Sequence, residues 1–278
     1  MWHKDQLQEL SQKTFFGKSL TIEHLHGSLP ANLHVPPNFR ESGGAYPAVL
    51  MLHGFGGNRH EHNGLFIKTA SALARAGMVA LRFDFRGFGE TCNSTREVTI
   101  ESQIQDAGDA FEHLLEYPFV DRKRTAVLGL SFGGLTAACL AGRREDVAAL
   151  VLWEPVFDMK GCIKRLYGNL SLKAVRARGY FQAGMVQVSE QFFTALDSLS
   201  VAETVEHFSR PVLIVQGVAD TIVPVDTAYQ WKRAFQSTEV EIDLLQEADH
   251  CFTRDAHTWA AIERSAAFLE AAFHAPVR

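Results

Sequence analysis

The alternation of short apolar runs with amphipathic segments constrains the fold of this chain more than any other feature. The apolar runs are Ala48–Leu52, Met78–Phe83, Thr125–Leu130, Ala148–Trp153, Val212–Val215 and Val240–Leu245. Apolar residues also recur at steps of three and four over 100–114 and 259–273, the spacing of a helix with one buried face. Apolar strands that alternate with such helices predict an α/β fold with a mostly parallel sheet and helices on both faces.

The N-terminal part departs from this alternation. Residues 15–35 read as two strands that meet near Gly27, and Pro36 and Pro37 follow them. This pattern predicts an antiparallel entry to the sheet. Because open α/β sheets bind ligands at the carboxyl ends of their strands, we expect the functional residues in the loops that follow the parallel strands.

One long interval interrupts the alternation between Trp153 and Val212. It is far longer than a helix with connections of about two to six residues. The chain has 278 residues, and a single core stops growing at about 250 to 300 residues. We therefore expect one domain, residues 1–278, with a cap or lid insertion over about 157–209. Its basic residues are interpreted as a solvated surface rather than an anion site, and they are Lys160, Lys164, Arg165, Lys173, Arg176 and Arg178.

Charge and cysteine content argue against several classes of partner. The net charge is −5, and like charges form no long run that would bind nucleic acid. No apolar run approaches the roughly 18 residues of a membrane span, and the polar start of the chain lacks the apolar core of a signal peptide. The four cysteines form no CxxC pair. We therefore expect a cytoplasmic protein with reduced thiols, no nucleic-acid partner and no membrane association, while the oligomeric state stays open, a homodimer being one alternative.

A serine lies between glycines at the end of one apolar run, in the motif GLSFGG at 129–134, and a helical stretch of small residues follows at 135–142. The glycines allow a tight turn from strand to helix, which exposes the Ser131 hydroxyl at the edge of the sheet. The helix N-terminus then points free N–H groups at the same place. This context predicts that Ser131 is a nucleophile, whereas the alternative is a plain glycine-rich turn.

A nucleophilic serine needs a histidine base and an acid that orients this histidine, because an isolated hydroxyl attacks poorly. In folds with this serine motif, the chain order is serine, acid, histidine. Asp220 and His250 each lie just after an apolar strand, in loops where such groups are expected. We predict that Ser131, Asp220 and His250 act together, with Asp158 or Glu154 as the alternative acid.

The oxyanion of an acyl-transfer intermediate needs backbone N–H donors. Phe132 offers one directly after the nucleophile, and the loop HGFGGN at 53–58 offers another, most directly from Phe55. The glycines of this loop permit the close approach that such a donor needs. We therefore predict an oxyanion hole formed by the backbone N–H groups of Phe55 and Phe132.

The polar residues around this loop do not indicate a cofactor. The run from Gly54 to Arg59 is not GxGxxG, because its last position is arginine. The histidines within 53–62 lack the HExxH spacing of a zinc site. We expect neither a metal nor another cofactor. The polar loop at 84–89 is expected to hold its own conformation rather than to take part in catalysis.

Aromatic residues near the strand ends and in the insertion are the candidates for substrate binding. Each could belong to the core, but together they could line an apolar acyl or aryl pocket. The candidates are Trp153, Phe157, Tyr180, Phe181 and Phe252. Within the insertion, we expect some aromatic side chains to pack against the core and at least one to face the substrate, among Tyr180, Phe181, Phe192 and Phe193.

Three stretches give the chain a specific resemblance, HGF at 53–55, RFDFRGFGE at 82–90 and ADHCF at 248–252. Together with the serine motif, they resemble the α/β-hydrolase superfamily over residues 20–273, and bacterial cinnamoyl and feruloyl esterases in particular. This resemblance implies an eight-stranded sheet, an oxyanion-hole N–H from Phe55 and a lid inserted after the sixth strand. The serine motif of those esterases is commonly GHSxGG, whereas leucine and phenylalanine flank the serine here. Serine aminopeptidase-like, lysophospholipase-like and thioesterase relatives share much of the pattern.

We expect a serine esterase without cofactor that cleaves small carboxylic esters, of short-chain or aryl (cinnamoyl) type, through an acyl-enzyme on Ser131. The same residues would serve a thioesterase, an amidase or aminopeptidase, or a hydrolase of carbon–carbon bonds. A hydrolase-fold binding protein with little or no turnover is the alternative outside enzymes. The pocket, rather than the fold, decides among these substrates.

Overall fold

The computed structural model describes residues 17–25, 27–40, 44–168 and 171–275. Its centre is an eight-stranded sheet with the strand order β1-β2-β4-β3-β5-β6-β9-β10. The strands are β1 (Lys18–His24), β2 (Gly27–His34), β3 (Tyr46–Leu52), β4 (Val79–Phe83), β5 (Val120–Leu130), β6 (Ala149–Trp153), β9 (Val212–Gly217) and β10 (Val240–Leu245). All pairs from β4 to β10 are parallel, which confirms the predicted mostly parallel sheet.

The predicted antiparallel entry is also present. β1 and β2 form an antiparallel hairpin in which His24 lies opposite Gly27, and β2 then pairs antiparallel with β4. The hairpin therefore adds two strands to one edge of the sheet, away from the strands that carry the candidate site.

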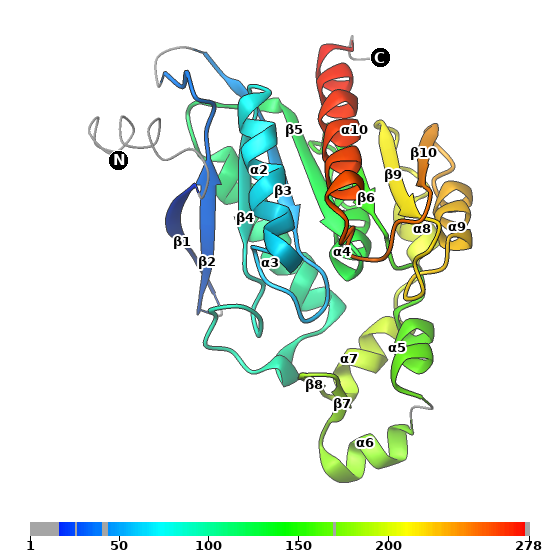
Figure 1. Ribbon diagram of the computed structural model, residues 1–278. Coiled ribbons are helices and arrows are strands. Elements are labelled where there is room, and N and C mark those ends of the chain that lie inside the picture. The colour runs from blue at the N-terminus through cyan, green and yellow to red at the C-terminus, as the bar shows by residue number, and fades with distance from the viewer. Residues whose placement is uncertain (1–16, 26, 41–43, 169–170, 276–278) are drawn as a thin grey trace.

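Helices cover both faces of the sheet, as expected (Figure 1). They are η1 (His62–Gly64), α2 (Leu65–Arg75), η2 (Thr95–Glu97), α3 (Ile100–Leu115), α4 (Phe132–Gly142), α5 (Met159–Tyr167), α6 (Leu172–Arg178), α7 (Glu190–Asp197), α8 (Val201–Val205), α9 (Asp226–Ala234) and α10 (Asp255–His274). α2 and α10 lie on one face, and α3 and α4 lie on the other. Within the described residues, no helix has the length and apolar character needed to cross a membrane.

Two apolar cores result, one under each layer of helices. Successive side chains of a strand point to opposite faces, and β3 shows the consequence. Leu50 packs into the core under α3 and α4, whereas Val49 and Met51 pack into the core under α2 and α10. Because β3 is buried on both faces, its sequence reads as a continuous apolar run rather than an alternating one.

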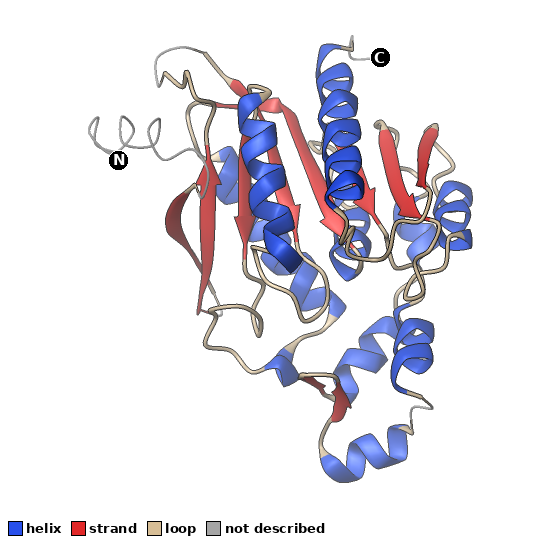
Figure 2. Cartoon of the chain, viewed as in Figure 1, coloured by secondary structure: helices blue, strands red, loops and turns tan. Residues whose placement is uncertain are grey.

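The long interval between β6 and β9 forms the four helices α5 to α8 and a small hairpin of β7 (Phe181–Ala183) and β8 (Val186–Val188). Figure 1 shows α5, α6, α7 and this hairpin beyond the edge where the parallel strands end. Figure 2 shows that the segment consists mainly of short helices joined by loops. We call residues 157–209 the insertion. It contacts the rest of the fold through α7 against α3, α8 against α4 and α9, and β8 against η2.

Candidate active site

Ser131 occupies the sharp turn from β5 into α4. Its backbone φ is 57° and its ψ is −116°, a conformation that residues other than glycine rarely adopt. Glycine at position 133 permits the turn, because a Cβ there would overlap the carbonyl oxygens of Leu52 and His53. A Cβ at Gly129 would likewise overlap the backbone of Gly133. The start of α4 therefore packs directly against the end of β3, and the serine is held at the edge of the sheet.

Three residues from three strand ends meet at this edge. His250 Nε2 lies 2.9 Å from Ser131 Oγ, and His250 Nδ1 lies 2.6 Å from Asp220 Oδ2. Ser131 follows β5, Asp220 follows β9 and His250 follows β10, so the parallel pairing of these strands brings distant parts of the chain together. The hydrogen bonds link a hydroxyl, an imidazole and a carboxylate in the order that activation of a serine requires.

Backbone donors complete the surroundings of Asp220. Its Oδ1 accepts hydrogen bonds from the N–H groups of Ile222 at 2.7 Å and Val223 at 2.9 Å. Burial acts to raise the pKa of Asp220, but the hydrogen bonds and the charge of His250 outweigh it and hold this pKa below its usual range. Asp220 is therefore held as a carboxylate and is oriented toward the imidazole.

The loop after β3 lies beside the serine. A Cβ at Gly54 would lie 3.4 Å from the Cβ of Ser131, and the Gly54 N–H donates to Glu61 Oε1 at 2.6 Å. The ring of His53 holds the loop through two hydrogen bonds. The Phe85 N–H donates to His53 Nε2 at 3.1 Å. The proton of the ring is therefore on Nδ1, which donates to Gly54 O at 2.8 Å. Burial lowers the pKa of His53, which favours this neutral ring. The loop that carries Phe55 is thus fixed next to the start of α4.

His53 and Glu61 are positioning residues that the sequence did not identify. Sequence reasoning predicted that the loop 53–58 supplies an oxyanion donor, but it considered the side chains of His53 and Glu61 only as possible metal ligands and set that role aside. The available signal was the position of His53 directly after a buried strand, where a polar residue needs a specific partner.

Three phenylalanines connect this loop, α4 and the insertion. The ring centroids of Phe55 and Phe132 lie 5.8 Å apart, and Phe192 of α7 lies 5.7 Å from Phe55 and 5.8 Å from Phe132. Phe192 is fully buried. The insertion is therefore anchored on the two residues whose N–H groups are the predicted oxyanion donors. Phe192 and the equally buried Phe193 are packing residues rather than exposed contacts for a substrate.

Two of the five candidates for substrate binding lie in the core. Trp153 is fully buried, its indole N–H donates to Ser265 Oγ of α10 at 2.9 Å, and its ring lies 5.7 Å from that of Phe252. Both rings belong to the core under α2 and α10. The structure thus corrects their placement in a pocket: the register of β6 turns Trp153, and the loop between β10 and α10 turns Phe252, into the core under α2 and α10.

The other three candidates belong to the insertion. Phe157 is half-buried and its ring packs edge-on against Trp231 at 5.0 Å. Tyr180 lies under the guanidinium of Arg96, 4.4 Å from its ring centroid, and Phe181 packs against Phe193. Of these three, Phe157 lines a cavity.

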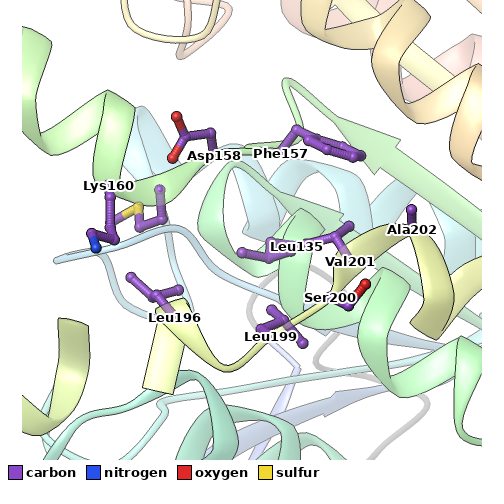
Figure 3. Close-up of a pocket in the computed structure, with 10 residues that line it drawn as sticks. Leu135, Phe157, Asp158, Lys160, Leu196, Leu199, Ser200, Val201 and Ala202 are labelled. Carbon is purple, nitrogen blue, oxygen red and sulfur yellow. The ribbon is translucent and has the colours of Figure 1, made fainter. Parts of the chain in front are cut away.

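This cavity of about 330 Å³ lies between α4 and the insertion, whose first residues form part of its wall. Leu135 contributes to its wall from the first turn of α4, and its N–H donates to the Ser131 carbonyl oxygen at 3.2 Å. Figure 3 shows Phe157 and Ala202 on one side of the cavity and Lys160 and Leu196 on the other. The lining is mainly apolar and consists of Leu135, Phe157, Asp158, Met159, Lys160, Leu196, Leu199, Ser200, Val201 and Ala202.

The two alternative acids have separate places. Asp158 caps α5 by accepting the Gly161 N–H at 2.9 Å, and it lines the cavity. Glu154 is fully buried, and an oxygen of its carboxyl, one of Asp220 and a ring nitrogen of His250 lie within 4.8 Å of one another. Asp220 is the acid that contacts the imidazole at 2.6 Å.

The polar loop after β4 holds conformation, as the sequence analysis expected. Asp84 accepts the Arg59 N–H at 2.6 Å and also pairs with the Arg59 guanidinium. Arg86 donates its N–H to Asp106 Oδ2 at 2.9 Å and forms an ion pair with the same carboxylate. These buried pairs tie the loop to Arg59 and to α3.

A profile of the prolyl oligopeptidase family matches residues 65–275. The acylamino-acid-releasing enzyme of Arabidopsis thaliana is 26% identical over 221 residues, which cover 74% of this chain and 27% of that enzyme. The esterase EstD of Thermotoga maritima is 28% identical over 147 residues, 51% of this chain and 33% of that esterase. The chain therefore spans only about a quarter to a third of the length of these two relatives.

A solved structure shows the same fold. Est1E from Butyrivibrio proteoclasticus with bound ferulic acid superposes with a TM-score of 0.79 at 20% identity, over 90% of this chain and 99% of that one. The likeness confirms the α/β-hydrolase fold that the serine motif and the strand pattern predict.

Proposed function

The chain belongs to the prolyl oligopeptidase family of α/β-hydrolases, and from that premise we propose that it is a serine hydrolase of small carboxylic esters. The observation that carries the proposal is the hydrogen-bonded series from Ser131 through His250 to Asp220. Ester cleavage through an acyl-enzyme is the chemistry that such a series performs without a cofactor. A cytoplasmic location and the absence of a nucleic-acid partner stay predictions.

In the proposed reaction, Ser131 Oγ attacks the acyl carbon while His250 Nε2 takes the hydroxyl proton. Asp220 stabilises the imidazolium that forms. The N–H groups of Phe55 and Phe132 are the proposed donors to the oxyanion of the tetrahedral intermediate. Removing one such donor typically raises the barrier by about 2.7 to 4 kcal/mol. The imidazolium then protonates the departing alcohol, and a water molecule repeats the same steps on the acyl-enzyme.

We propose the cavity beside α4 as the acyl pocket and the insertion as a lid over it. Its apolar lining suits an alkyl or aryl group of modest size, and Phe157 is the proposed aromatic contact. Tyr180 and Phe181 lie farther along the insertion and are proposed to support the lid. EstD is named as an esterase, and Est1E was solved with ferulic acid, so short-chain and hydroxycinnamoyl esters are the two series to compare first.

Cleavage of acylated amino acids or peptides is the second candidate. The observation that favours it is the family match together with the plant relative named for releasing acylamino acids. The same residues serve both reactions, so the leaving group distinguishes them. Esters, thioesters and anilides that share one acyl group should be compared by kcat/KM. A preference for the anilide or peptide series would replace the ester proposal.

Labelling of the serine tests the chemistry itself. Wild-type protein should react stoichiometrically with a fluorophosphonate, and the modified peptide should contain Ser131. Ser131→Ala should not react, while Ser209→Ala, which alters an exposed serine outside the cavity wall, should react like the wild type. A wild type that folds but does not react would replace the enzyme by a hydrolase-fold binding protein.

A further inference from the structure

A second buried carboxyl group lies beside the carboxylate that orients His250. Glu154 directly follows β6 with a positive φ of 46°, and its N–H donates to Val215 O of β9 at 3.0 Å. Its Oε1 accepts the Gly217 N–H at 2.7 Å. A Cβ at Gly217 would come within 2.8 Å of the same oxygen, so glycine is what lets the carboxyl approach the end of β9.

A buried glutamine links this carboxyl to the turn that holds Asp220. Gln216 Nε2 donates both to Glu154 Oε2 and to the carbonyl oxygen of Val223, the latter at 3.0 Å. The N–H of Val223 in turn donates to Asp220 Oδ1. Hydrogen bonds thus link Glu154 through Gln216 and Val223 to the turn that holds Asp220.

Carboxyl oxygens of Glu154 and Asp220 lie within 4.8 Å of each other. Two carboxyl groups this close do not both ionise in a buried site. Asp220 accepts three N–H donors, from Ile222, Val223 and His250, and these favour its ionised form. Burial raises the pKa of Glu154 to about 11, and the neighbouring charge of Asp220 raises it further. The hydrogen bond with His250 and the charge of that ring hold the pKa of Asp220 below its usual range. The proton that the pair shares therefore belongs to Glu154.

We propose that Glu154 is a positioning residue: as a neutral carboxylic acid it donates a hydrogen bond to Asp220 and holds this carboxylate in the orientation that His250 requires. The inference rests on the proposed serine hydrolase function and adds a fourth residue to it. Glu154 acts through Asp220 and has no part in the proton transfer between Ser131 and His250.

Neutrality of Glu154 matters for the charge of the site. When His250 takes the serine proton, one imidazolium faces one carboxylate, and the buried pair has no net charge. An ionised Glu154 would add a second negative charge and would favour the protonated imidazole, which cannot act as a base. The other titratable groups near Glu154 are Asp249 and Cys251, on the loop after β10, and Asp249 is held by its own bonds to Thr253.

Two substitutions separate a neutral hydrogen-bond donor from a charged group. Glu154→Gln keeps the shape, the acceptor for the Gly217 N–H and a donor toward Asp220. Its NH2 group replaces the oxygen that accepts from Gln216 Nε2, so the Gln216 amide must turn and present its Oε1 instead. Glu154→Leu keeps the volume and removes both the acceptor and the donor. On an activated ester, kcat/KM of the glutamine variant should stay within about threefold of the wild type, with an unchanged acidic inflection of its pH profile. The leucine variant should lose about tenfold or more, mainly in kcat, and its inflection should move.

Infrared difference spectra test the proton directly. The spectrum of wild type minus Glu154→Gln at pH 8 should contain the carbonyl band of a protonated carboxylic acid that shifts in D₂O. This measurement does not depend on whether Glu154→Leu folds. The proposal is overturned by the absence of that band, by a glutamine variant as impaired as the leucine variant, or by a leucine variant with wild-type kinetics. Fluorophosphonate labelling of the wild type reports separately on the hydrolase function, since a failure there leaves the protonation result intact.

Discussion

Ser131, Asp220 and His250 come from the ends of three strands, β5, β9 and β10, whereas the cavity beside α4 is walled largely by residues of the insertion. Strand pairing fixes the spacing of the first group, and every member has polar partners within hydrogen-bonding distance. The insertion contacts the fold through the buried ring of Phe192 and through hydrogen bonds nearer the surface, such as those between Gln187 and Thr95. On the proposed function, the sheet edge would supply the chemistry and the insertion would supply the selectivity.

The largest effect should follow from removing the nucleophile or the base. Ser131→Ala and His250→Ala should each lower kcat by a factor on the order of 10⁶ for every substrate, because the two act as a unit. The double variant should lose no more than either single variant. Steady-state kinetics with one activated ester measures this, and unchanged melting temperatures would show that the fold is intact. A double variant whose loss equals the product of the single losses would mean that the two residues act independently.

Asp220→Asn should have the next largest effect. The asparagine can still accept the N–H groups of Ile222 and Val223, so the turn stays folded. It no longer stabilises the imidazolium and favours the wrong tautomer of His250, so kcat should fall by a factor of about 10⁴.

Asp158→Asn is the matched control for this variant, because Asp158 caps α5 and lines the cavity without contacting the histidine. It should keep most of the wild-type kcat. If the effects of the two substitutions were reversed, the acid of the site would be Asp158, and the contact of Asp220 with His250 would be structural.

Phe192→Ala tests how far the two regions are independent. Removing a fully buried phenylalanine costs about 3 to 5 kcal/mol of stability. Phe193→Ala, the neighbouring buried ring of α7, should cost a similar amount. Because Phe192 alone of the two contacts Phe55 and Phe132, its loss should also lower kcat for all esters alike. Urea unfolding and a substrate panel should be compared for both variants. Equal kinetic losses would indicate that the insertion does not support the oxyanion loop.

The sheet and its edge were predictable because their signals are local. A strand buried on both faces reads as a continuous apolar run, and a strand-to-helix turn of the kind around Ser131 needs glycines at fixed offsets. The order of strands and helices then places Asp220 and His250 after the right strands. The strand β5 nevertheless begins at Val120, before the predicted Thr125. The sequence did not indicate this early start, because residues 121–124 are polar and at least partly exposed.

What could not be predicted depends on contacts between distant segments. The sequence placed Trp153 and Phe252 near strand ends, but the direction of each ring depends on packing against α10, with the register of β6 for Trp153 and the loop after β10 for Phe252. Likewise, Glu154 and Gly217 are joined only by the pairing of β6 with β9. The packing of Phe192 on Phe55 requires the folded insertion, whose short helices and hairpin have too few residues for a clear periodic pattern.

The smallest effect concerns the pH dependence of stability. Glu154 is protonated in the native protein, with a pKa raised to about 11, whereas in the unfolded chain it ionises near 4.5. Above about pH 4.5, unfolding therefore releases a proton, and stability falls as the pH rises, by at most about 1.4 kcal/mol per pH unit. Glu154→Gln cannot titrate and escapes this loss. Its free energy of unfolding minus that of the wild type should increase steadily from pH 5 to pH 8.

Other buried groups act in the opposite direction but cancel in this difference. Burial lowers the pKa of His34 to about 3, and burial also lowers that of His53. Both histidines are neutral when folded and protonate when unfolded below about 6.5, so both proteins lose stability as the pH falls. Urea unfolding at each pH gives the two free energies, and the exposed Glu203→Gln serves as a control that should show no such trend. A difference that stays constant across the range would mean that Glu154 is ionised in the folded protein, and the site at the sheet edge would then carry two buried negative charges.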